Sequence, residues 1–68
     1  MVQVGQIVRN RRSGPGAAVG KVCYVGPVTS CVMFPAGCLR IANVDLVEAE
    51  GEAPPCSERC SSGDCGGR

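Results

Sequence analysis

The 68-residue chain contains no histidine and no tryptophan, and it has a single tyrosine and a single phenylalanine. Histidine is the side chain that most often acts as a general acid or base near neutral pH, so its absence counts against an enzyme. A catalytic cysteine would need a neighbouring base or a helix N-terminus to activate it, and no pattern in the sequence indicates either. We therefore expect a protein that is not an enzyme.

Long apolar runs are also absent. No stretch approaches the ~18 residues that a membrane-spanning helix needs, so we expect no membrane partner. The first four residues, Met-Val-Gln-Val, show no charged region followed by an apolar core, and they therefore indicate no secretory signal. We expect a cytoplasmic protein, in which cysteines would be thiols or metal ligands instead of disulfides. The alternative is the mature form of an exported protein.

Cysteine, in contrast, is abundant, with six in 68 residues. This is near the ~8–10% at which a short secreted chain is interpreted as a disulfide scaffold. Cys23, Cys31 and Cys38 lie in the strand-like front segment, where a buried cysteine acts as a small hydrophobic residue. A disulfide from Cys23 to Cys31 or to Cys38 is the alternative for these three.

The other three cysteines, Cys56, Cys60 and Cys65, lie in a small, polar tail with the spacing C-x3-C-x4-C. Metal-binding thiolates are often two to four residues apart, so the spacing permits a zinc or iron–sulfur site on these three cysteines. Asp64, a front cysteine or a residue of a partner would supply the fourth ligand. Disulfides and a flexible tail are the alternatives. Small polar tails are usually disordered, so an ordered tail would need a disulfide, a metal or a partner surface to hold it.

The front segment alternates short Val, Ile, Cys, Tyr and Phe runs with Gly and Pro, which predicts strands and turns. We expect strands over 2–9, 19–25, 31–34, 38–42 and 46–48, a long loop over 10–18, and one 3-10 turn over 43–45. No helical period exceeds one turn. Side-chain alternation along these strands predicts which residues point inward. The expected core is Val8, Val22, Tyr24, Val32, Phe34, Leu39, Ile41 and Leu46.

These elements predict a mainly β fold, in which residues 1–48 form a small five-stranded SH3-like barrel. Residues 49–68 would form an acidic linker and an irregular Cys/Gly/Ser-rich tail. A barrel of this size is filled by its own side chains, so a ligand site would lie outside it or between subunits. A core of small aliphatic residues gives marginal stability, and crosslinks, homo-oligomerisation or a host protein would then support the fold.

Charge is unevenly distributed along the chain. Residues 1–45 contain five basic side chains and one acidic one, a net charge of +4, whereas residues 46–68 contain two basic and five acidic side chains, a net charge of −3. An acidic tail of this kind either shields the basic body or serves a second partner. The basic residues expected to bind a partner are Arg9, Arg11, Arg12, Lys21 and Arg40.

Three of these arginines fall in the loop sequence RNRRSGP, and guanidinium groups suit carboxylate and phosphate groups. A protein partner is favoured over nucleic acid, because the chain has few aromatics for base stacking and a modest positive charge. Nucleic-acid binding through residues 9–12 stays an alternative, as does a solvated loop without a partner.

A family resemblance extends from residue 4 to residue 47. It rests on Val8-Arg9-Asn10, Pro15-Gly16-Ala17, Val19-Gly20-Lys21-Val22, Tyr24-Val25-Gly26, Val32-Met33-Phe34 and Asp45-Leu46. This pattern resembles the small barrel of nitrogen-fixation maturation proteins of the NifZ type. The resemblance implies a bacterial accessory factor for a metallocluster enzyme. Residues 10–12 lack the Asn-Asp-Gly stretch of those proteins, and the cysteine tail has no counterpart in the pattern.

The function expected from these features is a non-enzymatic interaction module. It would be an accessory protein or small subunit that docks on a larger host, such as a metalloenzyme or its maturation machinery. The first alternative is metal or iron–sulfur binding by the tail cysteines, and the second is nucleic-acid binding by the arginine loop.

Overall fold

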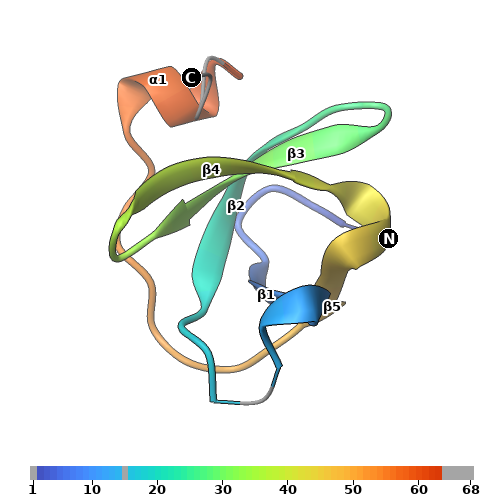
Figure 1. Cartoon of the computed structure of the whole chain (residues 1–68). Helices are drawn as coiled ribbons and strands as arrows, with labels where there is room; N and C mark the ends of the chain where they lie inside the picture. The colour runs from blue at the N-terminus through green and yellow to red at the C-terminus, as the bar shows by residue number, and fades with distance from the viewer. Residues whose placement is uncertain (1, 15, 64–68) are drawn as a thin grey trace.

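The computed structural model describes residues 2–14 and 16–63. Five strands form one antiparallel sheet in the order β4-β3-β2-β1-β5 (Figure 1). The strands are β1 (Ile7–Asn10), β2 (Gly20–Val25), β3 (Thr29–Phe34), β4 (Gly37–Ala42) and β5 (Leu46–Glu48). The first four follow one another as neighbours, and β5 returns to pair with β1. The prediction of a mainly β, five-stranded fold is therefore confirmed.

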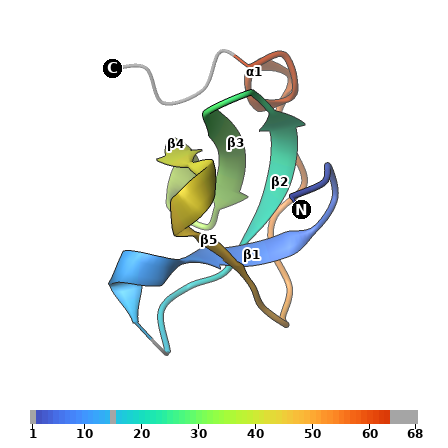
Figure 2. The ribbon, with the colours of Figure 1, turned by 90° about the vertical axis from the view of Figure 1, so that its right-hand side faces the viewer.

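The sheet is strongly curved but not closed. In Figure 2, β1 runs across the lower end of β2, at a steep angle to β2 and β3. Within the described residues β4 and β5 form no ladder with each other, so each is an edge strand. A closed barrel is thus not observed, and the inner face of the sheet stays open along β4.

Three short helical elements accompany the strands. They are η1 (Arg11–Ser13), η2 (Asn43–Asp45) and, after β5, α1 (Glu58–Ser61). The 3-10 turn η2 agrees with the expected one. In η1 the side-chain oxygen of Asn10 accepts a hydrogen bond from the Arg12 amide at 2.9 Å, which caps the turn. The sequence did not predict α1, because four residues are too few to show a helical period. Its cap is Ser57, whose hydroxyl accepts from the Cys60 amide at 3.2 Å.

A β-bulge in β2 explains one wrong core prediction. Val22 lies opposite Val32, but Tyr24 lies opposite Cys31, so the register shifts between Val22 and Tyr24. Because side chains alternate along a strand, the extra residue Cys23 moves every later side chain of β2 to the other face. Tyr24, expected inside, therefore lies on the outer face with 44% of its surface exposed.

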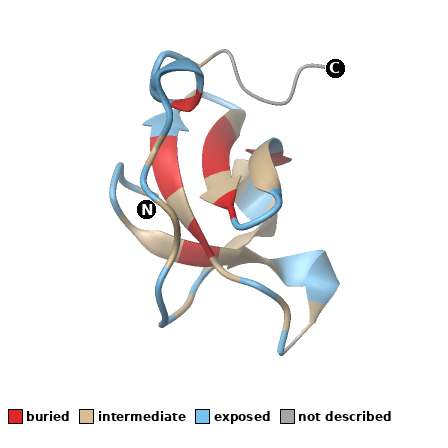
Figure 3. Cartoon of the chain, turned by 90° about the vertical axis from the view of Figure 1, so that its left-hand side faces the viewer, coloured by how far each residue is buried: buried red, intermediate tan, exposed pale blue. Residues whose placement is uncertain are grey.

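The main core lies on the inner face of the sheet (Figure 3). Its buried residues are Val8, Val22, Val32, Phe34 and Ile41, all of which were predicted to be inside, and Leu46 packs against them. Leu39 was also predicted to be inside, but it is 51% exposed. Its position opposite Val32 places it on the inner face. However, β4 is an edge strand, and no further strand of the described residues pairs with its outer edge.

A second buried cluster lies on the outer face of the sheet, under the tail. Cys23, Cys31 and Cys60 are buried there, and Met33, Cys38 and Cys56 pack against them. The segment expected to be an irregular tail thus forms, up to residue 63, a layer against β2 and β3 that includes α1 (Figure 1). Two disulfides between the sheet and the tail hold this layer in place.

Candidate functional sites

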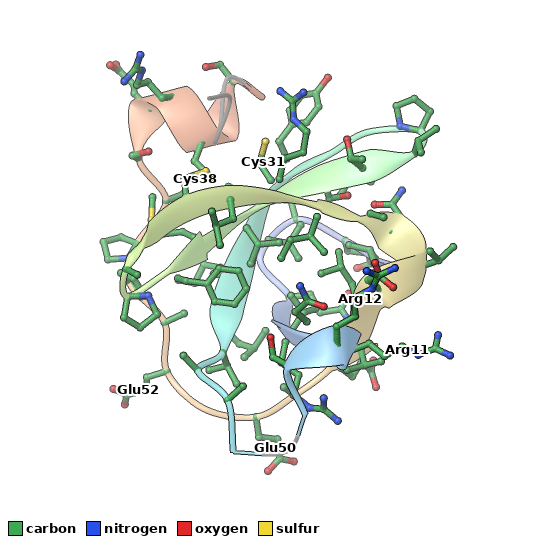
Figure 4. The ribbon with its side chains drawn as sticks, in the orientation of Figure 1. Arg11, Arg12, Cys31, Cys38, Glu50 and Glu52 are labelled. Atoms are coloured by element: carbon green, nitrogen blue, oxygen red, sulfur yellow. A yellow bond between two sulfur atoms is a disulfide. The ribbon has the colours of Figure 1, made fainter. Side chains whose placement is uncertain are left out.

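The basic residues expected to bind a partner do not form one patch. Arg11 and Arg12 lie on η1, beside η2 (Figure 4). Arg11 donates a hydrogen bond from Nη1 to the carbonyl oxygen of Val44 at 3.3 Å, and Nε of Arg12 lies 3.4 Å from Oδ2 of Asp45. The Arg12 side chain is 80% exposed. We call the surface formed by Arg11, Arg12 and Val44 the η surface.

The other basic residues lie elsewhere on the sheet. Lys21 is paired with Met33, and Arg40 with Cys31, so both lie on the outer face that carries the tail. Arg40 donates from Nη2 to the carbonyl oxygen of Gly63 at 3.1 Å, which links β4 to the tail. Arg9 lies on β1, opposite Val47 of β5.

A groove with a volume of about 570 Å³ opens beside η2. Its lining includes Val25, Val44 and Leu46, together with Gln6 and Glu48. Val44 is 76% exposed and Val25 is 39% exposed, so the mouth of this groove is apolar. The sequence analysis missed both valines. Val25 faces the groove only because of the bulge, and a valine in a single 3-10 turn has no periodic pattern that would mark it as a surface residue.

The cysteines form two disulfides that connect the sheet with the tail. Cys23 of β2 is bonded to Cys56, 33 residues away, and Cys38 of β4 is bonded to Cys60, 22 residues away. Cys31 of β3 is a buried thiol. The alternative pairing of Cys23 with Cys31 or Cys38 is therefore wrong. Those three cysteines lie on three adjacent strands, but the tail supplies the bonding partners.

The tail cysteines expected to bind metal have a different environment in the structure. Cys56 and Cys60 are in disulfides, and Cys65 lies outside the described residues. Across residues 2–14 and 16–63, no group of three or more Cys, Asp or Glu side chains is arranged to hold a metal ion. A metal site on these thiols therefore requires the reduced chain, because a sulfur in a disulfide is not a thiolate ligand.

The acidic linker does not neutralise the arginines in this structure. Glu50 and Glu52 are exposed on the segment that leads to the tail (Figure 4). In the described part of the chain the one ion pair is Arg12–Asp45, and both partners belong to residues 1–45. On the η surface, Asp45 therefore offsets the charge of Arg12, and the charge of Arg11 stays available to a partner.

Comparison of the chain with protein-family models, with curated proteins and with solved structures finds no match. No helix in the described residues is long and apolar enough to cross a membrane.

Proposed function

We propose that this chain is a non-enzymatic interaction module, an accessory protein or small subunit that docks on a larger protein through the η surface. The observation that carries the proposal is the exposure of Val44, at 76%, at the mouth of an apolar groove beside two arginines. An apolar centre with arginine at its side is a common composition for protein interfaces, where a few such residues contribute most of the binding energy.

The charges of the η surface specify the chemistry of the partner. Asp45 pairs with Arg12, whereas the contact of Arg11 is to a neutral carbonyl oxygen. A host carboxylate beside Arg11 would gain a charge-assisted hydrogen bond, and this bond is stronger than one between neutral groups. The proposed host therefore presents an apolar side chain flanked by an acidic residue.

Two further observations concern the fold and the kind of host. The strand order, with a 3-10 turn between β4 and β5, supports an SH3-like barrel as the class of fold. The sequence pattern that resembles NifZ-type proteins then supports a host that is a metalloenzyme or part of its maturation machinery. The same resemblance supports a bacterial, cytoplasmic protein, whereas the two disulfides, which were not expected in a cytoplasmic protein, favour an oxidising compartment.

The test is native mass spectrometry of the protein gently isolated from its own source, before and after treatment with chelator and reductant. A complex with a second, larger chain is the expected result. The variant Arg11→Ala/Arg12→Ala should lose this complex, and Arg59→Ala should retain it, because Arg59 is exposed on α1, away from the η surface. A wild-type chain recovered only as a bare monomer would contradict the proposal.

The same experiment separates the nucleic-acid alternative. If the isolated particle contains nucleic acid, its affinity should fall steeply with salt, because phosphate contacts release counterions. A complex with a protein through an apolar centre depends much less on salt.

A further inference from the structure

Five cysteines lie together on the outer face of the sheet. Three come from adjacent strands, Cys23 from β2, Cys31 from β3 and Cys38 from β4, and two come from the tail, Cys56 and Cys60. Figure 4 shows Cys31 and Cys38 on the side of the sheet where α1 lies. We call these five residues the sulfur cluster.

Three members of the sulfur cluster are buried, and Cys38 and Cys56 are partly buried. Cys23 is 4% exposed, Cys31 is 2% exposed and Cys60 is completely buried. Met33, whose thioether is also soft, packs against the same cluster. Cys23 lies here because it follows the inward-facing Val22 along β2, and the bulge then pairs Tyr24 with Cys31. The two disulfides use four of these five cysteines, so the buried thiol of Cys31 is not needed to hold the tail on the sheet.

From this arrangement we propose that the reduced chain binds one soft divalent cation of the zinc type, through four thiolates of the sulfur cluster that come from both the sheet and the tail. The disulfide-bonded chain is then the metal-free form of the same site. This proposal concerns a different face from the η surface and does not depend on host docking.

The geometry of the disulfides is compatible with such a site. The Cα atoms of Cys23 and Cys56 are 5.7 Å apart, and those of Cys38 and Cys60 are 6.1 Å apart. Two thiolates on one tetrahedral zinc ion, each at ~2.3 Å from the metal, are about 3.8 Å from each other. The two sulfur atoms of a disulfide are ~2.05 Å apart, so the sulfurs of each pair would move apart by less than ~2 Å on binding the metal. Rotation of the two side chains can supply this change.

Charge provides a separate argument for this site. Four thiolates around one divalent cation carry a net charge of −2, which is costly to bury without compensation. Lys21 and Arg40 lie on the same outer face, opposite Met33 and Cys31. These two cations, which were expected to bind a partner, are placed to offset that charge.

Conversion of the disulfide-bonded chain to the metal-bound chain takes two steps, reduction and binding of the cation. A dithiol reductant transfers two electrons and two protons to each disulfide, so the Cys23–Cys56 and Cys38–Cys60 bonds break to give four thiols and the reductant becomes a disulfide. The cation then binds four thiolates and releases four protons to the solvent. Metal and disulfides compete for the same sulfurs, so bound metal should slow reoxidation of the chain.

The test is titration of the reduced full chain with Cd²⁺ and Co²⁺, followed by thiolate-to-metal charge-transfer absorption and by native mass spectrometry. We expect one ion per chain with the spectrum of a tetrahedral thiolate site. The double variant Cys23→Ser/Cys38→Ser should weaken binding by about 100-fold or more, because it leaves too few sulfurs in the cluster. The matched control Cys65→Ser should bind as the wild type does.

Three outcomes would overturn the proposal: no ion bound by the reduced chain, binding that survives Cys23→Ser/Cys38→Ser, or binding that is lost in Cys65→Ser. The last two would assign the metal to the tail cysteines alone. If Cys23→Ser/Cys38→Ser does not fold, thermal unfolding in the presence of Zn²⁺ tests the proposal instead. Zn²⁺ should raise the unfolding temperature of the reduced wild type and of Cys65→Ser, and should leave that of the oxidised wild type unchanged. An equal rise in the oxidised chain would contradict the site.

Discussion

The hydroxyl of Ser30 on β3 donates a hydrogen bond to the side-chain oxygen of Asn43, the first residue of η2. Asn43 in turn donates from Nδ2 to the carbonyl oxygen of Gly26 at 2.9 Å. Ser30 is 1% exposed, so this contact is a buried polar bridge that holds η2 against the β2–β3 turn. It therefore also positions Val44, the centre of the η surface.

Removal of this bridge should cost measurable stability. Asn43→Ala leaves the Ser30 hydroxyl and the Gly26 carbonyl oxygen without their partner, and a buried unpaired polar group costs about 1–3 kcal/mol. Urea unfolding of the variant should show this loss. Ser30→Ala/Asn43→Ala should lose less than the sum of the two single variants, because the two residues share one hydrogen bond. Fully additive losses would mean that the bridge contributes nothing.

The Cys23–Cys56 crosslink should be a major contribution to stability. It closes a loop of 33 residues, and in the chain-entropy model a loop of this size contributes about 3–4 kcal/mol by restricting the unfolded chain. Cys23→Ala/Cys56→Ala should lower the free energy of unfolding of the oxidised, metal-free protein by this amount, measured in urea. An unchanged transition midpoint would show that the crosslink does not stabilise the fold.

The Arg12–Asp45 ion pair should contribute little to stability. Arg12 is 80% exposed, and exposed pairs typically contribute 0.2–1 kcal/mol, because solvent screens them. Arg12→Ala should therefore change the free energy of unfolding by less than about 1 kcal/mol. This makes Arg12 a suitable probe of docking, since lost host binding would not result from unfolding. If Arg12→Ala lowers the unfolding temperature strongly, the variant is not a suitable probe of docking.

Gly20 should not tolerate a side chain. A Cβ atom at this position would lie 2.5 Å from Cγ1 of Val32 and 2.8 Å from the carbonyl oxygen of Met33. Overpacking of this kind costs about 1–3 kcal/mol, and a clash with backbone cannot be relieved by a rotamer change. Gly20→Ala should destabilise the protein in thermal unfolding. Adding Val32→Ala should not restore stability, because the clash with Met33 remains. Full recovery would show that Val32 alone causes the effect.

Much of the sheet could be predicted from local sequence. Runs of β-branched and aromatic residues between Gly and Pro marked five strands, although the first begins at Ile7 and not at residue 2. Alternation correctly placed Val8, Val22, Val32, Phe34 and Ile41 in the core. The turn η2 was also predicted. These features depend on neighbours in the chain, which is why a single sequence reveals them.

The errors came from features that involve distant parts of the chain. Tyr24 faces outward because of a bulge opposite Cys31, and a register shift between two strands has no local signature. Leu39 is exposed because the sheet does not close over its edge strand. The η surface combines residues from η1 and η2, more than 30 positions apart.

The sequence by itself determined the β-strand content, the inward-facing valines, the absence of histidine chemistry and the excess of cysteine. Only the tertiary structure decided which cysteines meet. Cys23 and Cys56 are 33 residues apart, and six cysteines allow many pairings that spacing cannot distinguish. The folding of the tail over the outer face of the sheet selects the pairs, because a disulfide forms only where two Cα atoms approach within about 7 Å.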